Sequence, residues 1–511
     1  MLPIMARVLV VGGAGYVGSA TCAWLADAGH AVWILDNLST GHRELVLGEG
    51  FTFGSGGDKE RVTQLLRDQK IECVFHFAAR SLVGESVKYP EEYHENNVLQ
   101  TRNLLDAMAS AGVRNLVFSS TCAIFGDPGD QVINEALAKN PISPYGRTKL
   151  EAEQLIEDYS KKHGLRSIAL RYFNAAGAEP RNRVGEWHDS ETHLIPLVLK
   201  AARAGIPIEI FGTDYPTPDG TCVRDYVHVS DLAEVHASAM KKVMSADAGF
   251  FEAYNLGSEK GFSVKEVLST AEQVVGQKIP SVIKDRRPGD PPRLVADSTL
   301  AKSALGFKVD KGLKEIISTA WEWEKKRAQM LRPAIFLDRD GTLNEDPGYL
   351  SHPDQMKLLP HVGQALAELK AAGYLLLVIS NQSGVRRGLV EESALPKIHD
   401  RLQELLKPWS VQLDEFSFCI HHPDEHCECR KPKPKLIHDA AKKFGIDLKR
   451  SYMVGDKGSD IGVGIAAGCK GSILVRTGEG AKTEKKGEAA EAAFIATTLL
   501  DMARWVLSKQ N

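Results

Sequence analysis

The sequence lacks a long apolar segment, an excess of one charge and a secretory leader. No apolar run reaches the roughly 18 residues that a membrane-spanning helix needs. The net charge is −3 over 511 residues, so neither nucleic acid nor an acidic membrane surface is an expected partner. Residues 1–11 run directly into an apolar strand, without a signal-peptide cleavage pattern. These absences predict a soluble, cytoplasmic protein.

Cysteine is also scarce, with eight residues in the whole chain. Five of them are scattered, which is typical of reduced thiols: Cys22, Cys73, Cys122, Cys222 and Cys469. The other three lie within eleven residues, as Cys419-x-His421 followed by Cys427-x-Cys429. Three thiolates and one imidazole form a closed tetrahedral set, which predicts a structural zinc ion. The alternative is an ordinary loop histidine with bystander thiols.

The chain is too long for one ordinary hydrophobic core, and its 43% hydrophobic and 25% charged residues are globular values. Apolar strands alternate with amphipathic helices over the first 120 residues, and again after residue 334. Between these regions a charged helix ends at Arg327, and Pro333 follows. We therefore predict two α/β domains, 1–331 and 332–511. The first has a Rossmann-type parallel sheet with a small substrate-binding subdomain, and the second is Rossmann-like without a large cap.

A glycine-rich turn joins the first apolar strand to a helix, and reads Gly12-Gly13-Ala14-Gly15-Tyr16-Val17-Gly18. Glycine lets the backbone approach a pyrophosphate, and the helix N-terminus supplies amide donors. Asp36 ends the second strand, where a carboxylate can bind the adenosine ribose hydroxyls and would repel a 2′-phosphate. A glycine turn alone is a weak signal, but this order of elements predicts NAD rather than NADP.

Tyr145 and Lys149 lie four residues apart and therefore share one face of a helix. A lysine ammonium beside a tyrosine favours the phenolate, so we expect a Tyr145 pKa lowered towards neutrality. Thr121 ends another strand, where its hydroxyl could bond a substrate oxygen. An isolated tyrosine and lysine pair is commonly a surface feature of a helix. Beside a dinucleotide loop, the same pair favours hydride chemistry.

Residues 5–325 resemble the extended short-chain dehydrogenase/reductase superfamily and, more narrowly, UDP-glucose 4-epimerase. The motifs that carry the resemblance are Gly12 to Gly18, Asp36-Asn37, His76-Phe77-Ala78-Ala79, Tyr145-Gly146-Arg147-Thr148-Lys149, Arg171-Tyr172-Phe173-Asn174, Asp219-Gly220-Thr221-Cys222-Val223-Arg224-Asp225-Tyr226 and Arg286-Arg287-Pro288-Gly289-Asp290. The resemblance extends along nearly the whole of residues 5–325.

The resemblance implies that Tyr145 removes the proton of the sugar 4-hydroxyl while C4 gives a hydride to NAD. The 4-keto sugar then rotates and takes the hydride back on its other face. Thr121 stands where the family has serine or threonine. The implied cofactor contacts are Gly12, Gly15, Tyr16, Val17, Gly18, Asp36, Asn37, Asp58 at the adenine, Phe77, Asn96 on the nicotinamide side, Tyr145, Lys149 and Phe173. The implied contacts to the nucleotide of the substrate are Asn174, Arg224, Arg287 and Asp290.

Three positions depart from patterns of related enzymes. Ser81 replaces a lysine that contacts the cofactor in some members. Leu294 stands where a bulky tyrosine narrows the sugar pocket of strict glucose/galactose enzymes, so N-acetylated sugars remain open as substrates. Cys122-Ala123 stand where related sugar dehydratases carry Asp-Glu as an acid and base pair. We therefore do not expect dehydration.

The second predicted domain opens with Asp338-x-Asp340-Gly341-Thr342 after an apolar strand. One carboxylate can attack phosphorus while the other handles the proton of the leaving oxygen. We expect Asp338, Asp340 and Asp456 to hold Mg²⁺, because clustered carboxylates at a phosphate site need a cation. The residues expected to contact the phosphoryl oxygens and substrate are Ser380, Asn381, Arg430, Lys431 and Lys457.

This order of motifs resembles the haloacid dehalogenase (HAD) superfamily over residues 332–480. Within it, the zinc loop resembles the subgroup of D-glycero-D-manno-heptose 1,7-bisphosphate phosphatase and histidinol-phosphate phosphatase. The heptose type is matched by Phe336 to Leu343, Gly348-Tyr349, residues 381–384, Cys419-x-His421-His422-Pro423, residues 430–434, residues 453–457 and Val475-Arg476-Thr477-Gly478. The short loop from His421 to Cys427 is nearer the histidinol type, so that substrate remains open.

We interpret the chain as a bifunctional enzyme that uses a nucleotide sugar and a sugar phosphate in precursor synthesis for cell-surface polysaccharides. UDP-glucose/UDP-galactose and the heptose bisphosphate are the favoured substrates. The alternatives for the first domain are a UDP-N-acetylhexosamine, a UDP-pentose or a nucleotide-activated heptose. A further alternative is that one domain only binds ligand or partner. Related epimerases are commonly dimers, which predicts a homodimer through the first domain.

Overall fold

The computed structural model describes residues 5–129, 131–189, 191–287 and 290–509. The chain divides into two compact units, residues 1–36 with 40–327 and residues 37–39 with 328–511. The boundary predicted after residue 331 lies between helix α11 (Leu313–Arg327) and strand β14 (Ala334–Leu337). Over the described ranges, no helix combines the length and the apolar character that crossing a membrane requires.

The first unit is built on a parallel sheet whose seven described strands run in the order β10-β6-β5-β4-β1-β2-β3. The strands are β1 (Arg7–Val11), β2 (Ala31–Asp36), β3 (Gly50–Phe53), β4 (Cys73–His76), β5 (Asn115–Thr121), β6 (Arg166–Tyr172) and β10 (Phe251–Leu256). The chain runs outwards from β1 to β3 and then returns to β4 on the other side of β1. The strand order therefore reverses between β1 and β4, which is where ligands bind in such sheets.

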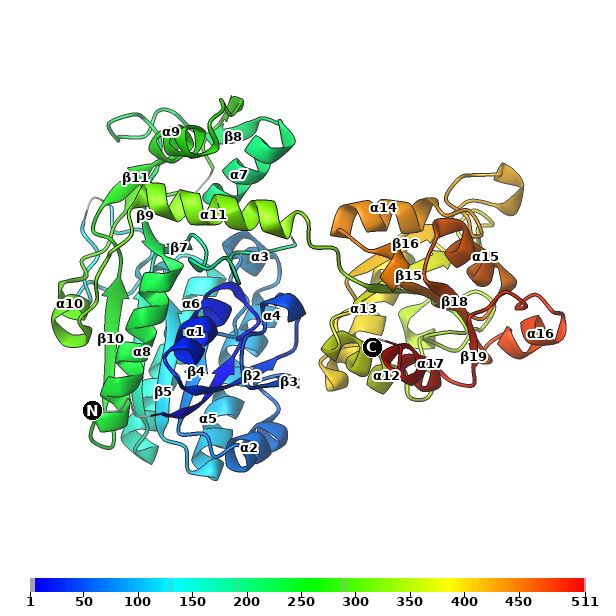
Figure 1. Ribbon diagram of the computed structural model, residues 1–511, viewed down its shortest axis with the longest axis horizontal. Helices are drawn as coiled ribbons and strands as arrows, with labels where there is room; N and C mark the ends of the chain where they lie inside the picture. The colour runs from blue at the N-terminus through cyan, green and yellow to red at the C-terminus, as the bar shows by residue number, and fades with distance from the viewer. Residues whose placement is uncertain (1–4, 130, 190, 288–289, 510–511) are drawn as a thin grey trace. The chain divides into compact units, whose positions relative to one another are not determined.

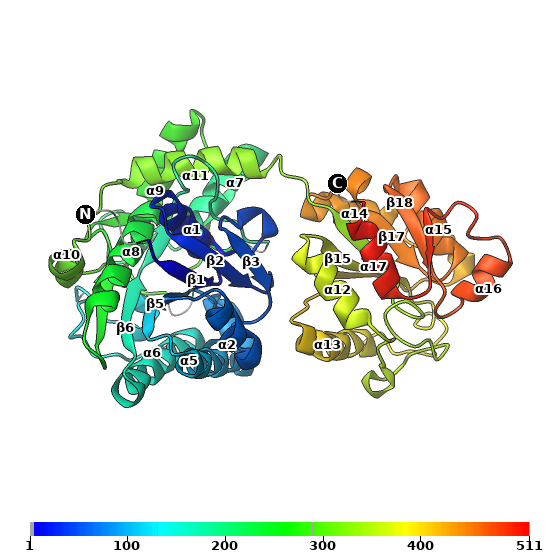
Figure 2. The same ribbon diagram turned by 60° about the horizontal axis from the view of Figure 1, so that its bottom comes forward.

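Helices cover both faces of this sheet (Figures 1 and 2). One face carries α1 (Tyr16–Asp27), α8 (Val229–Ser245) and α10 (Thr299–Leu305); the other carries α2 (Lys59–Asp68), α5 (Gln100–Ala111) and α6 (Pro144–His163). Strand β1 shows the cause, because Val8 and Val10 pack into one core while Leu9 and Val11 pack into the other. Successive side chains of a strand point to opposite faces, so a strand covered on both sides is apolar throughout.

A smaller substructure follows β6 and contains the predicted substrate-binding residues. Its strands are β7 (Asn174–Ala176), β8 (Ile208–Phe211), β9 (Val223–His228), β11 (Gly261–Ser263), β12 (Ser281–Lys284) and β13 (Arg293–Leu294). Strand β9 pairs with β7, β11 and β13, while β8 pairs with β12. Helices α7 (Leu194–Ala204), α9 (Val264–Val275) and α11 share a separate apolar core. This part corresponds to the small substrate-binding subdomain predicted from the sequence.

The second unit contains a parallel sheet whose six described strands run in the order β16-β15-β14-β17-β18-β19. Besides β14 they are β15 (Leu375–Asn381), β16 (Glu415–Cys419), β17 (Tyr452–Gly455), β18 (Gly471–Val475) and β19 (Phe494–Ala496). Figure 2 shows helices α12 (Val362–Ala371), α13 (Ala394–Leu406) and α17 (Leu499–Leu507) beside those strands, with α14 (Lys435–Phe444) and α15 (Gly458–Ala467) also packed in the unit. The predicted fold class, two Rossmann-type α/β domains, is confirmed.

Candidate active sites of the two units

The glycine turn of the first unit packs tightly against its own backbone and against the segment after β4. A Cβ atom at Gly18 would lie 2.3 Å from the carbonyl oxygen of Gly12. A Cβ atom at Gly12, whose φ is +85°, would lie 2.4 Å from the amide nitrogen of Ala78. Side chains are therefore excluded at positions 12 and 18, so the strand-to-helix turn can close tightly at the N-terminus of α1.

Asp36 and Tyr16 are positioned by this same turn. The Asp36 carboxylate is buried at the end of β2, and its Oδ2 accepts a hydrogen bond of 2.9 Å from the amide of Ala14. The Tyr16 hydroxyl donates to the carbonyl oxygen of Gly177 at 2.6 Å. Burial raises the pKa of Tyr16 well above its usual value, and the charges of Glu186 and Glu191 add to the effect. The dinucleotide loop is thus tied to the chain that leaves β7.

The other predicted cofactor residues lie on several different segments of the first unit. Phe77 follows β4, and its amide donates to the carbonyl oxygen of Val11 at 2.8 Å. Asp58 caps α2 by accepting from the Arg61 amide at 3.1 Å. Asn37 accepts from the Ser39 amide at 3.1 Å, and Val17 lies in the first turn of α1.

Asn96 and its neighbour Asn97 differ in a way that the sequence does not show. The Asn96 side chain donates to Asn97 Oδ1 at 3.0 Å and is half-buried. Asn97 is 2% exposed, donates to the Arg80 carbonyl oxygen and to Thr148 Oγ1, and accepts from the Arg80 amide. Two adjacent asparagines carry the same chemistry, so only the packing identifies Asn97 as the one that joins β4, η2 (Glu95–Leu99) and α6.

Thr121, Tyr145 and Lys149 meet at the carboxyl end of β5. Thr121 is the last residue of that strand, and its hydroxyl is hydrogen-bonded to that of Tyr145. Tyr145 and Lys149 lie in the first two turns of α6, which Ser143 caps through a 3.1 Å bond from the Gly146 amide. Lys149 is 2% exposed, and its ammonium donates to the Ser119 carbonyl oxygen at 2.6 Å. The predicted triad is therefore brought together by one strand end and one helix.

The predicted effect of Lys149 on Tyr145 is not found. Burial raises the pKa of Tyr145 to about 12, although the hydrogen bond from Thr121 acts in the opposite direction. Burial also lowers the pKa of Lys149 to about 7, against the raising effect of Glu153. The lysine ammonium lies 4.4 Å from the centre of the Phe118 ring and is bonded to Ser119 rather than to the phenol. Desolvation outweighs the charge effect that the sequence suggested.

The residues predicted to hold the nucleotide of the substrate lie around β7 and β9. Asn174 donates to the Asp225 carbonyl oxygen at 2.8 Å. Arg224 forms a short ion pair with Asp290, and the two side chains are 17% and 32% exposed. The Arg287 guanidinium lies 4.0 Å from the centre of the Phe211 ring. Pro288 and Gly289 of the predicted motif lie outside the described residues. The described members thus form one cationic and aromatic region of the small substructure.

An apolar cluster lies next to the end of β5. Phe173 is 9% exposed and packs with Ile124, Phe125 and the partly buried Cys122 and Leu294. Leu294 lies on β13 in register with Arg224 of β9. The position that departs from the tyrosine of the strict glucose/galactose enzymes therefore lies beside the end of β5. Ser81 is exposed.

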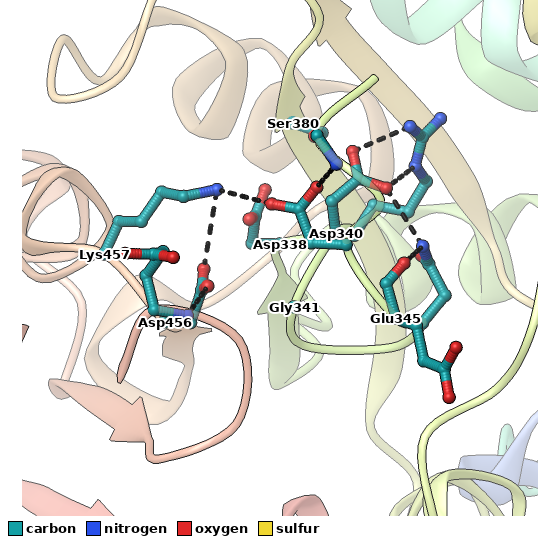
Figure 3. A network of polar contacts seen from close by, with 12 residues as sticks. Asp338, Asp340, Gly341, Glu345, Ser380, Asp456 and Lys457 are labelled. Atoms are coloured by element: carbon teal, nitrogen blue, oxygen red, sulfur yellow. Dashed lines mark hydrogen bonds and ion pairs between the residues drawn. The ribbon is translucent and has the colours of Figure 1, made fainter. Parts of the chain in front are cut away.

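In the second unit, the predicted catalytic residues come from the carboxyl ends of neighbouring strands. Asp338 follows β14, Ser380 lies near the end of β15, and Asp456 follows β17. Figure 3 shows Asp338 between Asp456 and Lys457 on one side and Asp340 on the other, with Ser380 above it in this view. Parallel strands bring their carboxyl ends to one edge of the sheet, which explains why residues more than a hundred positions apart in sequence meet here.

Asp338 is held by a buried lysine. Lys431 Nζ lies 2.7 Å from Asp338 Oδ1 and 2.6 Å from Asp460 Oδ1, and all three side chains are at most 5% exposed. Burial alone would lower the pKa of Lys431, but the two carboxylates raise it above its usual value. The lysine therefore stays charged and fixes the orientation of Asp338.

Asp456 lies in a close-packed pocket of backbone. Gly341 has a φ of +82°, and a Cβ atom there would lie 2.3 Å from Asp456 Oδ2. That oxygen accepts from the Glu479 amide at 2.8 Å, while Oδ1 is buried and has no hydrogen-bond partner among the described residues. Burial raises the pKa of Asp456 to about 7; the charge of Lys457 opposes this and that of Asp338 adds to it.

The carboxylate set differs from the predicted one. Single oxygens of Asp338, Asp456 and Asp460 lie within 4.8 Å of one another, and the Asp340 side chain is not among them. Asp340 instead accepts from Arg339 at 2.9 and 2.7 Å, and from Asn344 and Gln382 at 3.0 and 2.9 Å. The only sequence signal for Asp460 is an acidic residue in the first turn of α15, and helices commonly carry one there.

The hydrogen bonds of Asp340 also decide its charge. Burial alone would raise its pKa, but the Arg339 guanidinium and the amides of Gln382 and Asn344 hold the pKa below its usual value. Gln382 also donates to Ser380 Oγ at 2.9 Å and therefore links Asp340 to the predicted phosphoryl-binding hydroxyl.

The remaining predicted substrate contacts lie at the end of β15 and on the loops that follow β16 and β17. Asn381 Oδ1 accepts from the Lys431 amide at 3.1 Å, which joins β15 to the loop after β16. Arg430 NH1 is buried and lacks a hydrogen-bond partner among the described residues. Lys457 Nζ lies 3.8 Å from Asp456 Oδ1 and 3.6 Å from Asp346 Oδ2.

The predicted zinc ligands converge at the end of β16. One atom from each of Cys419, His421, Cys427 and Cys429 lies within 4.8 Å of all the others. Cys419 Sγ is 3.4 Å from Cys427 Sγ, and Cys429 Sγ is 3.3 Å from His421 Nδ1. The loop that ends in these residues continues directly into Arg430 and Lys431. The arrangement therefore links the cluster to the residues that surround Asp338.

The fold and the two sites define a fusion of a Rossmann-type nucleotide-sugar enzyme with a phosphohydrolase-like domain. Residues 8–257 match the model of the NAD dependent epimerase/dehydratase family, and residues 428–502 match a HAD-hydrolase-like family. The chain belongs to the NAD dependent epimerase/dehydratase family. Its N-terminal domain is of the UDP-glucose 4-epimerase type, and its C-terminal domain is HAD-like.

Individual relatives cover the first unit. UDP-glucose 4-epimerase of Rhizobium leguminosarum bv. trifolii is 46% identical over 325 residues, which are 63% of this chain and 98% of the relative. The solved structure of UDP-glucose 4-epimerase from Brucella ovis with NAD has 45% identity and a TM-score of 0.61, and covers 62% of this chain and 98% of its own. A structure from Stenotrophomonas maltophila with NAD and formylated UDP-arabinopyranose has 36% identity and a TM-score of 0.61, and covers 63% and 99%.

Proposed function

We propose that the first unit interconverts UDP-glucose and UDP-galactose by NAD-dependent epimerisation at C4. The observation that carries the proposal is the contact between the Thr121 and Tyr145 hydroxyls at the end of β5, beside the buried Lys149. The names of the relatives support this substrate pair, since those reported above are UDP-glucose 4-epimerases that match over nearly their whole length.

The residues of the glycine turn fit a dinucleotide. Gly12 and Gly18 stand where a side chain would clash with backbone, and the Asp36 carboxylate lies against the Ala14 amide. NAD would be held by this turn and by Asp36 and Asn37; the proposed contacts also include Asp58, Phe77, Asn96 and Phe173. Bound NAD supplies a reversible acceptor for the hydride of sugar C4.

Tyr145 is the proposed acid and base of the epimerisation. Its deprotonated hydroxyl takes the proton of the sugar 4-hydroxyl, and it returns that proton after the 4-keto sugar has presented its other face. The bond from Thr121 favours the phenolate, because it lowers the Tyr145 pKa against the effect of burial. Lys149 lies on the same helix as Tyr145 and donates to the Ser119 carbonyl oxygen of β5. An ammonium there would favour the phenolate further once Tyr145 ionises.

The sugar of the first unit has one specific alternative. The Leu294 side chain packs in the apolar cluster near the end of β5, and it is smaller than the tyrosine of strict glucose/galactose enzymes. This favours access for a UDP-N-acetylhexosamine as a second candidate substrate. A UDP-pentose is a further candidate, since the Stenotrophomonas maltophila relative binds formylated UDP-arabinopyranose. A nucleotide-activated heptose remains the candidate that would connect the two units.

The test of this part is turnover of UDP-galactose by the full-length protein. Tyr145→Phe should abolish epimerisation and leave phosphate release by the second unit unchanged. Tyr159→Phe is the matched control, because this tyrosine lies on the same helix but its hydroxyl donates to Asp106 at 2.6 Å. If Tyr145→Phe retained wild-type turnover, the proposed site would be wrong.

A substrate panel separates the candidate sugars. UDP-galactose, UDP-N-acetylgalactosamine and UDP-arabinose would be compared on the wild type and on Leu294→Tyr. The substitution should reduce kcat/KM for the N-acetylated sugar relative to UDP-galactose. An unchanged ratio would show that position 294 does not limit the pocket.

We propose that the second unit is a phosphatase that forms a phospho-aspartate at Asp338 and acts on D-glycero-D-manno-heptose 1,7-bisphosphate. The observation that supports phosphoryl transfer is the convergence of Asp338, Ser380, Lys431 and Asp456 at one sheet edge. The HAD-hydrolase-like match over residues 428–502 supports hydrolysis. The heptose substrate rests on the resemblance of the motifs.

The carboxylates fit a divalent cation. Three buried carboxylates lie together, and Asp456 Oδ1 has no hydrogen-bond partner among the described residues. Asp338 and Asp456 would hold Mg²⁺, with Asp460 in reach. The carboxylate of Asp340, which Arg339, Asn344 and Gln382 bind, lies outside this set. Bound Mg²⁺ supplies positive charge against the phosphoryl oxygens.

The protein residues account for both proton transfers. An oxygen of Asp338 attacks phosphorus, the bond to the leaving oxygen breaks, and that oxygen takes a proton from Asp340. Water then attacks the phospho-aspartate while Asp340 takes its proton, which releases phosphate and restores Asp338. The low pKa of Asp340 suits the second step, in which the carboxylate acts as a base, and opposes the first step, in which Asp340 must carry a proton. Ser380, Arg430 and Lys457 are the proposed donors to the phosphoryl oxygens, and Asn381 positions Lys431.

The sulfur and nitrogen ligands around Cys419 fit a structural zinc ion. Four ligand atoms that are all within 4.8 Å of one another match a compact tetrahedral set with no open position. Such an ion would fix the loop that carries Arg430 and Lys431. The zinc content of Cys427→Ser/Cys429→Ser should fall by one ion per chain. Cys469→Ser, a substitution elsewhere in the same unit, should retain it.

The phosphatase test is Mg²⁺-dependent phosphate release from heptose 1,7-bisphosphate, fructose 1,6-bisphosphate and histidinol phosphate. Asp338→Asn should be inactive on all three and should keep wild-type epimerisation. Asp354→Asn, which removes a largely exposed carboxylate of the same unit, is the control. Preference for histidinol phosphate would replace the heptose proposal. Absence of release from every phosphomonoester would show that this unit only binds.

We also propose a homodimer formed through the first unit. Helix α3 (Val83–Lys88) and the segment after it expose apolar side chains, with Val83, Val87 and Tyr89 about half to two-thirds exposed. A second copy of the chain is the expected occupant of this surface. Light scattering of the wild type and of Val87→Glu tests it, because the variant should shift the mass towards that of one chain.

A further inference from the structure

Four metal-ligating side chains gather in the first unit, on the segment between Gly185 and helix α7. They are Glu186, His188, Glu191 and His193, and one oxygen or nitrogen atom from each lies within 4.8 Å of all the others. None of them belongs to the dinucleotide turn, to the Thr121–Tyr145–Lys149 triad or to the predicted substrate contacts. The group therefore needs its own explanation.

The Nδ1 atoms of His188 and His193 both lie near the carboxylates of the two glutamates. His188 Nδ1 lies 3.2 Å from Glu191 Oε2 and 3.6 Å from Glu186 Oε1. His193 Nδ1 makes a short contact with Glu186 Oε1 and lies 4.0 Å from Glu191 Oε1. A simple ion pair joins one imidazole to one carboxylate. Here the four groups face a common centre, which is the arrangement of ligands around a single ion.

Burial of the carboxylates makes a countercharge necessary. The Glu186 side chain is 6% exposed and that of Glu191 is 9% exposed. Two desolvated carboxylates so close together repel each other strongly unless positive charge lies between them. A divalent cation neutralises both charges at once, and neutral imidazoles complete its coordination.

The ligand types indicate the class of metal. Two imidazole nitrogens and two carboxylate oxygens suit zinc and similar first-row transition metals, whereas Mg²⁺ and Ca²⁺ prefer oxygen ligands alone. Four protein ligands close a tetrahedral site and leave no position for substrate. We propose that Glu186, His188, Glu191 and His193 form a structural site for a zinc-type divalent cation.

The surroundings show what such an ion would connect. The Glu186 carbonyl oxygen accepts from Trp323 Nε1 at 2.8 Å, and His193 is the residue that precedes α7. Between them, Trp187 stacks on the ring of His42 at 4.3 Å, and the His42 amide donates to the Ala14 carbonyl oxygen of the dinucleotide turn at 3.0 Å. The ion would therefore fix the connection between the cofactor loop and the small substrate-binding substructure.

The competing explanation is a metal-free cluster in which protonated histidines pair with the two glutamates. The two explanations differ in bound metal, which can be counted on the full-length protein by elemental analysis after purification with zinc and removal of free ions. His188→Ala/His193→Ala should contain one zinc ion fewer per chain than the wild type. The control variant His94→Ala/His352→Ala should keep the wild-type content, because each of those histidines faces one carboxylate that is about half or more exposed.

The cysteine cluster of the second unit must be counted separately. Cys427→Ser/Cys429→Ser should lose the other zinc ion and keep this one, so failure of either site can be recognised without the other. If His188→Ala/His193→Ala bound as much zinc as the wild type, the proposal would be overturned.

A second measurement tests the site without His188→Ala/His193→Ala, in case that variant folds poorly. Chelator-treated Cys427→Ser/Cys429→Ser should show a higher Tm after addition of zinc alone, and the same protein with Glu191→Gln should show a much smaller rise. Equal rises in the two proteins would exclude a site at Glu191, whatever the behaviour of the histidine variant.

Discussion

Substitution of Glu153 by glutamine should destabilise the first unit more than any exposed charge change on the same helix. Glu153 of α6 binds Arg171 of β6 through two bonds, Nε to Oε1 at 2.9 Å and NH2 to Oε2 at 2.7 Å. The two side chains are 3% and 2% exposed, and Ser120 also donates to Glu153. Removal of the negative charge leaves a buried guanidinium without a counterion.

The expected cost follows from this burial. Removing one partner of a buried ion pair typically costs about 3–5 kcal/mol. The glutamine amide can keep part of the hydrogen bonding, so we expect about 3 kcal/mol. The matched control is Glu157→Gln, since Glu157 and Lys161 form an exposed i,i+4 pair on the same helix at 2.7 Å. That pair should contribute no more than about 0.5 kcal/mol.

Hydrogen exchange measures the effect in each unit separately. About 3 kcal/mol corresponds to a roughly 100-fold faster exchange of the most protected amides in β5 and β6. Amides of β14 and β17 in the second unit provide the internal reference and should not change. If Glu153→Gln accelerated exchange no more than Glu157→Gln did, the assumed cost of the unpaired buried arginine would be refuted.

Three further predictions concern the hydroxyl contact, a glycine and pH. Thr121→Ala should lower epimerase kcat by about 10–100-fold, because the bond that lowers the Tyr145 pKa is lost. Thr121→Ser should largely retain activity. Equal losses of kcat in the two variants would contradict a role for the hydroxyl. Gly341→Ala should abolish phosphatase activity, since its Cβ would lie 2.3 Å from a buried carboxylate oxygen. The control is Gly388→Ala, whose Cβ meets open space at a φ of +69°. It should keep the wild-type kcat and lower the Tm only through backbone strain. Burial lowers the pKa of His236 from 6.5 to about 4, so the unfolded chain binds more protons in that window. The contribution of His236 to the stability of the first unit should therefore fall by up to about 3 kcal/mol as pH drops from 6.5 to 4. His236→Asn should make the pH dependence of stability less steep in denaturant titrations, while His76 and His228, whose pKa values burial also lowers, keep the rest of it.

The sequence predicts well the features that depend on the end of one strand or on the spacing within one short motif. The apolar strand before Gly12 and the position of Asp36 after the next strand predict the crevice of the first unit, because parallel strands place their ends at one edge. The four-residue spacing of Tyr145 and Lys149 likewise predicts their shared helical face. The close spacing of Cys419, His421, Cys427 and Cys429 predicts a compact group, and the structure brings the four atoms together.

The features that the sequence did not predict depend on which partner each buried polar group binds in the folded chain. Asp340 follows Asp338 by two residues, yet its carboxylate is bound by Arg339 and by Gln382 from the next strand, and therefore does not join the carboxylate cluster. Lys149 likewise bonds to a strand carbonyl, so the balance of burial and charge at Tyr145 reverses the expected pKa shift. Spacing fixes the position of a Cα atom on an element, but the orientation and charge of a buried polar group depend on tertiary contacts and desolvation. The Asp340 carboxylate, the proposed proton carrier, is thus held in part by Asn344 and Gln382, which lie outside the motif at residues 338–342.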